Sequence, residues 1–172
     1  LIAPTLENGL QLKFKGKITS VPYIKMTLTL LAELGVGLSW NDDTITIQPK
    51  PIIENKTIVV ESDWSSASYY YSLCALSPNS EIILSSYKKT SLQGDSVLSE
   101  IYKNLGVETV FKENSILLKN TKTLDFSLLS LDLINAPDIA QTIAVTCFGL
   151  GIECFLTGLH TLKIKETDRL VA

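Results

Sequence analysis

A dense group of charged residues lies near the end of the chain, from Lys163 to Arg169. Five of these seven residues are charged, against 19% of the whole chain. If the segment begins a helix, Lys165 and Arg169 lie on one face, and Glu166 borders it. Two cations can hold an anionic ligand while the carboxylate exchanges a proton. The alternative is a solvated helix start whose charges pair only with each other.

Other polar residues stand at or just before the predicted starts of further helices. They are Ser20, Tyr23, Asp63, Ser65, Ser66, Gln93, Gly94, Asp95 and Asp138. Free N–H groups and the helix dipole attract anions at such positions. Each residue alone also has an ordinary explanation as an N-cap, a first-turn acid, a packing residue or a turn. Together they predict one surface that binds phosphorylated or carboxylated small molecules, provided that the units carrying them stack in parallel.

The composition narrows the class of protein. The chain has 172 residues, of which 45% are hydrophobic, as expected for a well-buried globular protein. A net charge of −3 argues against a nucleic-acid-binding surface. No apolar run approaches the roughly 20 residues that span a bilayer, and we expect neither a membrane partner nor a signal peptide.

The cysteines and the single histidine indicate the compartment and exclude one kind of site. Cys74, Cys147 and Cys154 stand in apolar surroundings without CxxC spacing. This pattern is typical of reduced core residues in a cytoplasmic protein. Because His160 is the only histidine, we expect no zinc site.

The strongest structural signal is an internal repeat with an offset of 71 residues. At this offset Leu34–Val36 falls on Leu105–Val107, and Ile45 falls on Ile116, without a gap. Such self-similarity indicates repeated structural units. Hydrophobic periodicity predicts a unit of strand, helix, strand, helix and a two-stranded hairpin. The middle copy has predicted strands at 57–61, 81–85, 107–112 and 115–119, and predicted helices at 65–76 and 94–105. The second of these helices should bury Val97, Leu98, Ile101 and Leu105.

The first copy supplies a strand at 10–15, a helix at 20–34 that Gly35 ends, and a hairpin at 36–48. The helix from Pro137 to Leu150 is apolar almost all round, so we expect it to be buried. The units should therefore be layered α/β structures with helices inside and sheets outside. Since neither end of the sequence coincides with a unit boundary, we expect the natural protein to be longer on both sides.

Five segments occur in an order that resembles one enzyme family. They are Ser20-Val-Pro-Tyr-Ile, Val60-Glu-Ser-Asp-Trp-Ser-Ser-Ala-Ser-Tyr, Leu92-Gln-Gly-Asp, Ala136-Pro-Asp-Ile-Ala-Gln-Thr-Ile-Ala and Lys165-Glu-Thr-Asp-Arg-Leu. The chain resembles the 5-enolpyruvylshikimate-3-phosphate synthases over essentially its whole length. Two alternatives stay open: the related transferase acting on UDP-N-acetylglucosamine, and a non-catalytic anion-binding repeat domain. The related transferase uses a reactive cysteine in a basic loop, and no cysteine here has such surroundings.

The resemblance implies an incomplete enolpyruvyl transferase fold, an inside-out α/β barrel made of repeated βαβαββ units. Residues 1–51 would be part of the third unit of one domain, and residues 52–57 would cross between domains. Residues 58–121 would form a complete unit of the second domain, and residues 122–172 part of the next. The full-length protein would be a monomer in the cytoplasm.

The resemblance also implies a reaction and roles for four residues. The enolpyruvyl group of phosphoenolpyruvate would pass to the 5-hydroxyl of shikimate 3-phosphate, releasing phosphate without a metal or organic cofactor. Asp138 would accept the hydroxyl proton, and Lys165 would contact that hydroxyl and assist. Glu166 would handle the proton on the methylene carbon, and Arg169 would bind phosphoenolpyruvate.

Shikimate 3-phosphate would be bound by Ser20, Tyr23 and Thr161, together with Asp138 and Lys165. The chain departs from the family where Ser62 replaces Gly, Thr161 replaces Asn and Lys163 replaces Arg. Other substrate-binding residues of the family would lie outside this chain, so we expect residues 1–172 alone to be inactive.

Overall fold

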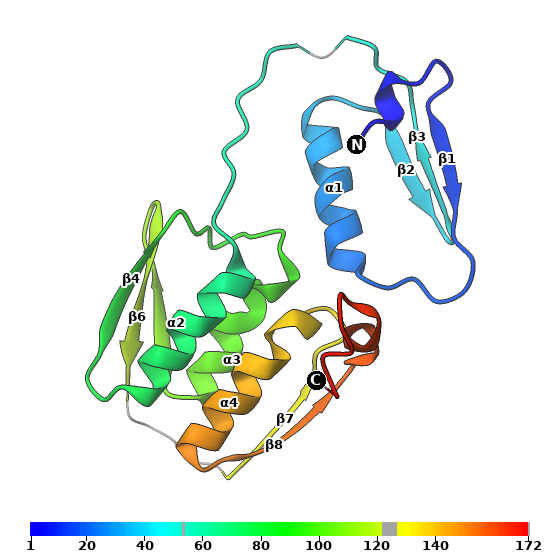
Figure 1. Ribbon diagram of the computed structural model, residues 1–172. Helices are drawn as coiled ribbons and strands as arrows, with labels where there is room; N and C mark the ends of the chain where they lie inside the picture. The colour runs from blue at the N-terminus through cyan, green and yellow to red at the C-terminus, as the bar shows by residue number, and fades with distance from the viewer. Residues whose placement is uncertain (53, 122–126, 172) are drawn as a thin grey trace. The chain divides into compact units, whose positions relative to one another are not determined.

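The computed structural model describes residues 1–52, 54–121 and 127–171. The chain forms two compact units, Leu1–Val59 and Val60–Ala172 (Figure 1). The first unit is a three-stranded antiparallel sheet, in the order β1-β3-β2, with one helix packed against it. Its elements are η1 (Ala3–Thr5), β1 (Leu10–Lys13), α1 (Val21–Glu33), β2 (Leu38–Asn41) and β3 (Thr44–Ile47).

The described residues of the second unit form two sheets and three α-helices. One sheet is antiparallel, in the order β4-β6-β5, and the other is the parallel pair β7-β8. Its helices are α2 (Trp64–Leu76), η2 (Gly94–Val97), α3 (Leu98–Asn104), η3 (Pro137–Ile139), α4 (Ala140–Leu150) and η4 (His160–Ile164). Its strands are β4 (Glu81–Ser85), β5 (Val107–Phe111), β6 (Ser115–Asn120), β7 (Leu128–Asp132) and β8 (Glu153–Thr157).

The predicted repeat appears as a repeated sheet topology. The orders β1-β3-β2 and β4-β6-β5 are equivalent, and both sheets are antiparallel. The hairpin register also repeats, since Trp40 pairs with Ile45 and Phe111 pairs with Ile116. The remaining strand is shifted by one residue, because Leu12 pairs with Ile45 whereas Leu84 pairs with Ile116. The mixed α/β fold of repeated units is therefore confirmed.

Helices α2, α3 and α4 are joined by buried aromatic and hydroxyl contacts. The Tyr71 and Tyr102 rings lie 5.1 Å apart, and both residues are fully buried. The Tyr102 hydroxyl lies 2.8 Å from Thr146 Oγ1, which lies 2.8 Å from Ser72 Oγ. Buried hydroxyls that bond to one another avoid the loss of their hydrogen bonds to water. The chain from Tyr102 through Thr146 to Ser72 therefore links all three helices.

One predicted strand is wrong. Residues 57–61 do not belong to a strand, and the Val60 side chain is 83% exposed. This segment contacts the end of β4 at Ser62, whose backbone N–H donates a hydrogen bond to Ser86 O, one residue after β4, at 2.7 Å. The apolar side chains before Ser62 find no core within the described residues. The hydrophobic pattern of residues 57–61 was therefore not sufficient to form a paired strand.

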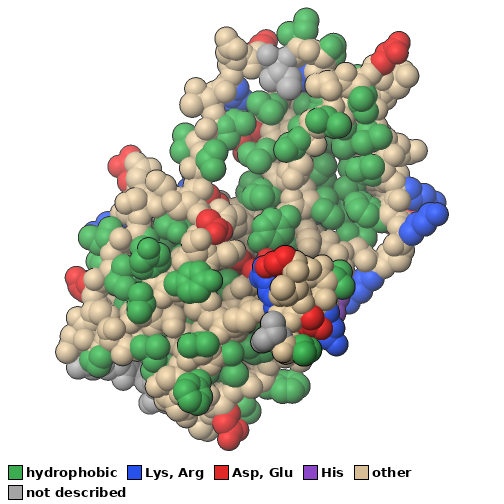
Figure 2. Space-filling model, viewed as in Figure 1, with side chains coloured by type: hydrophobic (Ala, Val, Ile, Leu, Met, Phe, Trp, Pro, Cys, Tyr) green, Lys and Arg blue, Asp and Glu red, His purple; other side chains and the backbone are tan. Residues whose placement is uncertain are grey.

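Helix α4 is not buried all round, contrary to the prediction. Val145 is 61% exposed and Phe148 is 88% exposed, whereas Ile143 is fully buried. One side of α4 packs against α2 and β8, and no described element covers the other side. Exposed apolar residues continue onto α2, and Figure 2 shows hydrophobic side chains over this face. The α2 residues are Tyr69, Tyr70, Leu73 and Leu76.

Two further burial predictions need correction. Val97, expected in the core, is 38% exposed, and Tyr102 is buried in that region of the unit instead. Cys154, expected to be a core cysteine, is exposed, whereas Cys74 and Cys147 are buried. Cys154 lies on β8, which has a single neighbouring strand, so the sheet does not enclose it.

Candidate functional site

The start of helix α2 carries the expected N-cap. Asp63 has extended backbone angles, and its carboxylate accepts hydrogen bonds from the backbone N–H groups of Ser65 and Ser66 at 3.1 and 3.2 Å. Partial burial acts to raise the pKa of Asp63, but the hydrogen bonds from Ser66 and Ser65 outweigh it and lower the pKa. Asp63 therefore satisfies two of the free N–H groups of the first turn.

We predict that Asp63→Ala lowers the free energy of unfolding by about 1 kcal/mol, because the first turn of α2 loses its side-chain cap. Urea unfolding followed by circular dichroism measures this difference. Asp63→Asn is the matched control, since an amide oxygen still caps the helix. Equal losses in both variants would show that the charge, and not the cap, stabilises α2.

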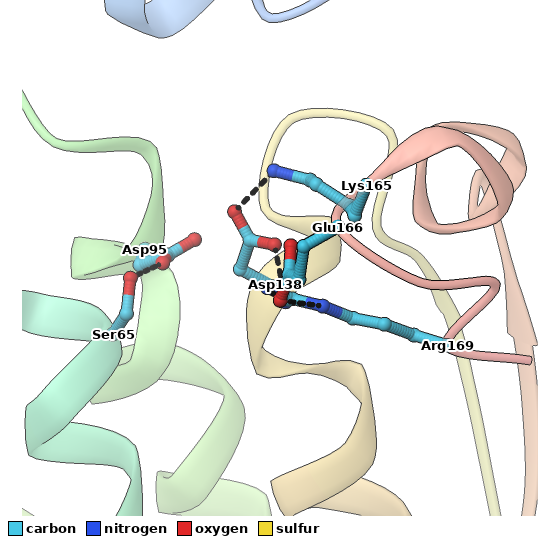
Figure 3. A network of polar contacts seen from close by, with 6 residues as sticks. All are labelled: Ser65, Asp95, Asp138, Lys165, Glu166 and Arg169. Atoms are coloured by element: carbon cyan, nitrogen blue, oxygen red, sulfur yellow. Dashed lines mark hydrogen bonds and ion pairs between the residues drawn. The ribbon is translucent and has the colours of Figure 1, made fainter. Parts of the chain in front are cut away.

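Asp138 lies at the centre of the ion-pair cluster (Figure 3). It follows Pro137 in η3, and its side chain is 20% exposed. Lys165 Nζ lies 3.1 Å from Asp138 Oδ2, and Arg169 Nη1 lies 3.1 Å from Asp138 Oδ1. Glu166 forms a second ion pair with Arg169, whose Nε lies 3.0 Å from Glu166 Oε1. The structure thus brings together the four charged residues that the motifs singled out.

The segment that supplies Lys165, Glu166 and Arg169 is not a helix, contrary to the prediction. The 3-10 helix η4 ends at Ile164, and bends and a turn follow. The backbone N–H of Arg169 instead donates to Leu162 O at 3.1 Å, and the buried Leu162 side chain anchors the segment.

The contacts between Glu166 and Arg169 determine the charge state of both side chains. The backbone N–H of Glu166 and the hydrogen bond from Arg169 both lower the pKa of Glu166. The hydrogen bond with Glu166 raises the pKa of Arg169 above its ordinary value. Both residues are therefore charged at neutral pH, and Glu166 is a base while this pair is intact.

An open hollow of about 350 Å³ adjoins this cluster. It is lined by Asp63, Ser65, Ser66, Tyr69, Asp138, Lys165, Glu166 and Arg169. A second hollow of about 710 Å³ continues along α2 and α4 and shares Tyr69, Asp138, Glu166 and Arg169 with the first. Among the described residues, no three His, Cys, Asp or Glu side chains are grouped so that they could hold a metal ion.

The remaining predicted site residues lie elsewhere in the chain. Ser20 and Tyr23 belong to the first unit, at the start of α1. Ser20 has a left-handed backbone (φ 55°), and its side chain does not cap the helix, so the plain N-cap interpretation is wrong. Thr161 lies in η4 and is 8% exposed. Its hydroxyl is buried and has no hydrogen-bond partner among the described residues. His160 is exposed and begins η4.

The Gln93-Gly94-Asp95 segment is more than a turn. Gln93 Oε1 accepts a hydrogen bond from the Trp64 backbone N–H at 2.8 Å, and Gln93 Nε2 donates to Ser62 O at 2.9 Å. Asp95 is 1% exposed and accepts a hydrogen bond from the Ser65 hydroxyl. From sequence alone Asp95 is one polar residue among several at predicted helix starts, and its burial and its contact with Ser65 are apparent only in the structure.

Comparison with known proteins identifies the family. The sequence matches the family described as EPSP synthase (3-phosphoshikimate 1-carboxyvinyltransferase) over residues 1–172. The chain belongs to the EPSP synthase family. It is 45% identical over 173 residues to a 3-phosphoshikimate 1-carboxyvinyltransferase of Bacteroides fragilis, covering 100% of this chain and 42% of the relative.

More distant relatives of the same name cover the same part of the family sequence. The Methanospirillum hungatei protein is 31% identical over 100% of this chain and 41% of its own length. The Shewanella pealeana protein is 30% identical over 100% of this chain and 40% of its own length. The chain thus spans about two fifths of the length of these EPSP synthase relatives. In the part of the chain that the structure describes, no helix is long and apolar enough to cross a membrane.

Proposed function

We propose that the full-length protein containing this chain transfers the enolpyruvyl group of phosphoenolpyruvate to the 5-hydroxyl of shikimate 3-phosphate. Phosphate is the second product, and the reaction belongs to aromatic amino-acid biosynthesis. The observation that carries this proposal is the position of Asp138 between Lys165 and Arg169, each 3.1 Å away. One carboxylate between two cations, beside an open hollow, suits two anionic reactants and a proton transfer.

The reaction needs several proton transfers that the cluster can perform. In the addition step, the hydroxyl oxygen bonds to C2 of phosphoenolpyruvate and loses its proton to Asp138, while C3 gains a proton from Glu166. In the elimination step, C3 returns a proton to Glu166, the C2–O bond to phosphate breaks, and the proton held by Asp138 leaves with the phosphate. Lys165 stabilises the attacking oxygen, and Arg169 binds the anionic groups of phosphoenolpyruvate.

The Glu166–Arg169 pair links substrate binding to proton transfer. In the structure Arg169 lowers the pKa of Glu166, which disfavours the protonated acid. When Arg169 turns to phosphoenolpyruvate, Glu166 loses this hydrogen bond and binds a proton more readily. Glu166 can then donate a proton to C3 in the addition step and remove one in the elimination step.

We propose that shikimate 3-phosphate is recognised by Ser20, Tyr23 and Thr161, together with Asp138 and Lys165. The buried Thr161 hydroxyl has no hydrogen-bond partner in the part of the chain that the structure describes, and a substrate oxygen could satisfy it. The left-handed Ser20 backbone is another feature common at ligand-binding positions, because such strain must be held in place by the fold. We further propose that the two units belong to different domains, with a crossover at residues 52–57.

We predict that Thr161→Val raises the KM for shikimate 3-phosphate by about 10-fold, the value of one hydrogen bond to a charged ligand. Valine keeps the shape but removes the hydroxyl. The free energy of unfolding should stay unchanged or rise, because the lost hydroxyl has no protein partner. Steady-state kinetics and urea unfolding measure the two effects. A stability loss with an unchanged KM would assign Thr161 a structural role only.

The full-length protein tests the function directly. Phosphate release from phosphoenolpyruvate is measured with shikimate 3-phosphate, with UDP-N-acetylglucosamine and without an acceptor. We expect release only with shikimate 3-phosphate. Release only with the nucleotide sugar would support the related transferase, and binding without release would support a non-catalytic anion-binding domain. Burial raises the pKa of Cys147 to about 11 and also raises the pKa of Cys74, which argues against a reactive thiolate at either position.

The oligomeric state, the cellular location and the inactivity of residues 1–172 alone are tested separately. We propose that the full-length protein is a cytoplasmic monomer, which sedimentation and cell fractionation test. We also propose that residues 1–172 alone do not turn over, because the chain covers 42% of its relative from Bacteroides fragilis. Phosphate release by the isolated chain would contradict this proposal.

A further inference from the structure

A second carboxylate, which the proposed mechanism does not use, lies beside the Asp138 cluster. Asp95 belongs to η2 and is 1% exposed. Its Oδ2 accepts the hydrogen bond from Ser65, whereas its buried Oδ1 has no partner among the described residues. Figure 3 shows one oxygen of Asp95 pointing toward Asp138. Because buried polar atoms are normally satisfied, an unpartnered carboxylate oxygen facing a site indicates a partner that arrives there.

The charges around Asp95 identify that partner. Burial raises the pKa of Asp95; the Ser65 hydrogen bond lowers it, the charges of Asp138 and Asp63 raise it, and Lys165 lowers it. Lys165 is thus close enough to act on both Asp95 and Asp138. Its ammonium has three donors on a flexible stem, so it can move between two acceptors.

Lys165 needs a second hydrogen-bond acceptor when a substrate hydroxyl approaches Asp138. Both of its carboxylate oxygens contact cations, Lys165 on one side and Arg169 on the other. A hydroxyl that gives its proton to Asp138 must approach one of these oxygens, where it competes with the cation already bound there. Lys165 then needs another anion nearby, and Asp95 Oδ1 is a free acceptor beside the cluster.

We propose that Asp95 is a positioning residue that holds the Lys165 ammonium when a substrate hydroxyl occupies Asp138. Ser65 fixes the Asp95 carboxylate through Oδ2, and Oδ1 receives Lys165. Lys165 consequently stays next to the reacting oxygen during proton transfer. This inference rests on the proposed function, and it assigns Asp95 no contact with either substrate.

Asp95→Asn in the full-length protein tests this inference. The amide oxygen still accepts the Ser65 hydrogen bond, but the negative charge is lost. We expect kcat to fall about 10-fold while both KM values change less than about 3-fold, as for a group that acts mainly in the transition state. The thermal midpoint should not fall, because an unpaired buried charge is removed. Glu100→Gln, an exposed carboxylate of α3, is the matched control and should leave kcat unchanged.

The reactivity of Lys165 gives a readout that does not depend on turnover. Dilute acetic anhydride modifies the free amine of lysines, and mass spectrometry reports the rate at Lys165 relative to Lys103. We expect Asp95→Asn to raise this ratio about 3-fold, because one anion that stabilises the ammonium is lost. Glu100→Gln should not raise it.

The outcomes separate this inference from the proposed function. An unchanged kcat in Asp95→Asn, with an active parent protein, would overturn the inference alone. A lower kcat with an unchanged Lys165 ratio would also overturn it, since Asp95 would then act only on structure. A parent protein that releases no phosphate with shikimate 3-phosphate would refute the proposed function itself.

Discussion

Asp138→Asn is expected to lower kcat of the full-length protein at least about 100-fold, because the asparagine amide cannot accept the hydroxyl proton. The substitution preserves size, but it removes the negative charge from both ion pairs, and only one of the two cations keeps an oxygen acceptor at residue 138. Stopped-time phosphate assays with saturating substrates measure kcat. KM for either substrate should change far less than kcat, because the lost interaction belongs mainly to the proton transfer.

Asp168→Asn is the matched control for this result. Asp168 lies in the same segment, is exposed, and accepts a hydrogen bond from the Leu170 backbone N–H at 3.1 Å, which an asparagine can also accept. The Asp168→Asn substitution removes one negative charge but leaves Asp138 unchanged, and kcat should stay near the parent value. Near-normal turnover by Asp138→Asn would remove Asp138 from the role of general base.

Ile143→Ala is expected to lower the free energy of unfolding by about 2–5 kcal/mol, through lost apolar burial and the cavity left behind. Ile143 is fully buried on α4, in the core shared with α2 and α3. Urea unfolding of the chain, followed by circular dichroism, measures the change.

Val145→Ala provides the comparison on the same helix. Val145 is 61% exposed, so its truncation should change stability by less than about 0.5 kcal/mol, and alanine's higher helix propensity favours the variant. Equal losses for Ile143→Ala and Val145→Ala would show that α4 does not pack with the orientation described. The pair therefore tests which side of α4 faces the core.

The regular elements were largely predictable because local chemistry determines them. The predicted helix at 20–34 is α1 (Val21–Glu33), whose apolar residues Leu28 and Leu31 recur at helical spacing. Gly35 ends it with φ +76°, and the Val36 backbone N–H reaches back to Leu31 O at 3.0 Å. The 71-residue offset anticipated the equivalence of the two antiparallel sheets, since equal side-chain patterns select equal pairings.

The errors concern neighbours that a single sequence does not show. Ile58 to Val60 have strand-forming side chains, but the described residues contain no strand paired with them. Phe148 is apolar, but burial also requires a second surface, and among residues 1–52, 54–121 and 127–171 none covers the Phe148 side of α4. A hydrophobic pattern states which side chains would be buried, and it does not state what covers them.

The site was predictable as a group of residues and less so in its geometry. Motif spacing singled out Lys165 and Arg169, and the structure places both against Asp138, which precedes them by 27 and 31 residues. The expected helix was wrong, yet a looser segment produced the same grouping. The sequence does not distinguish Asp95 from an ordinary turn residue, because a Gln-Gly-Asp triplet is most often a turn. Its buried oxygen, without a partner among the described residues, is apparent only in the folded structure.

The chain of hydroxyls from Tyr102 through Thr146 to Ser72 has a consequence for the distant charged cluster. It fixes the axial alignment of the three helices, since sliding any one of them by a single turn, roughly 5.4 Å, would break at least one of the two contacts. The first turns of α2 and η3 are thereby kept level with one another. The position of the Asp138 carboxylate therefore depends on hydroxyl contacts made further along the helices, away from the ion pairs themselves.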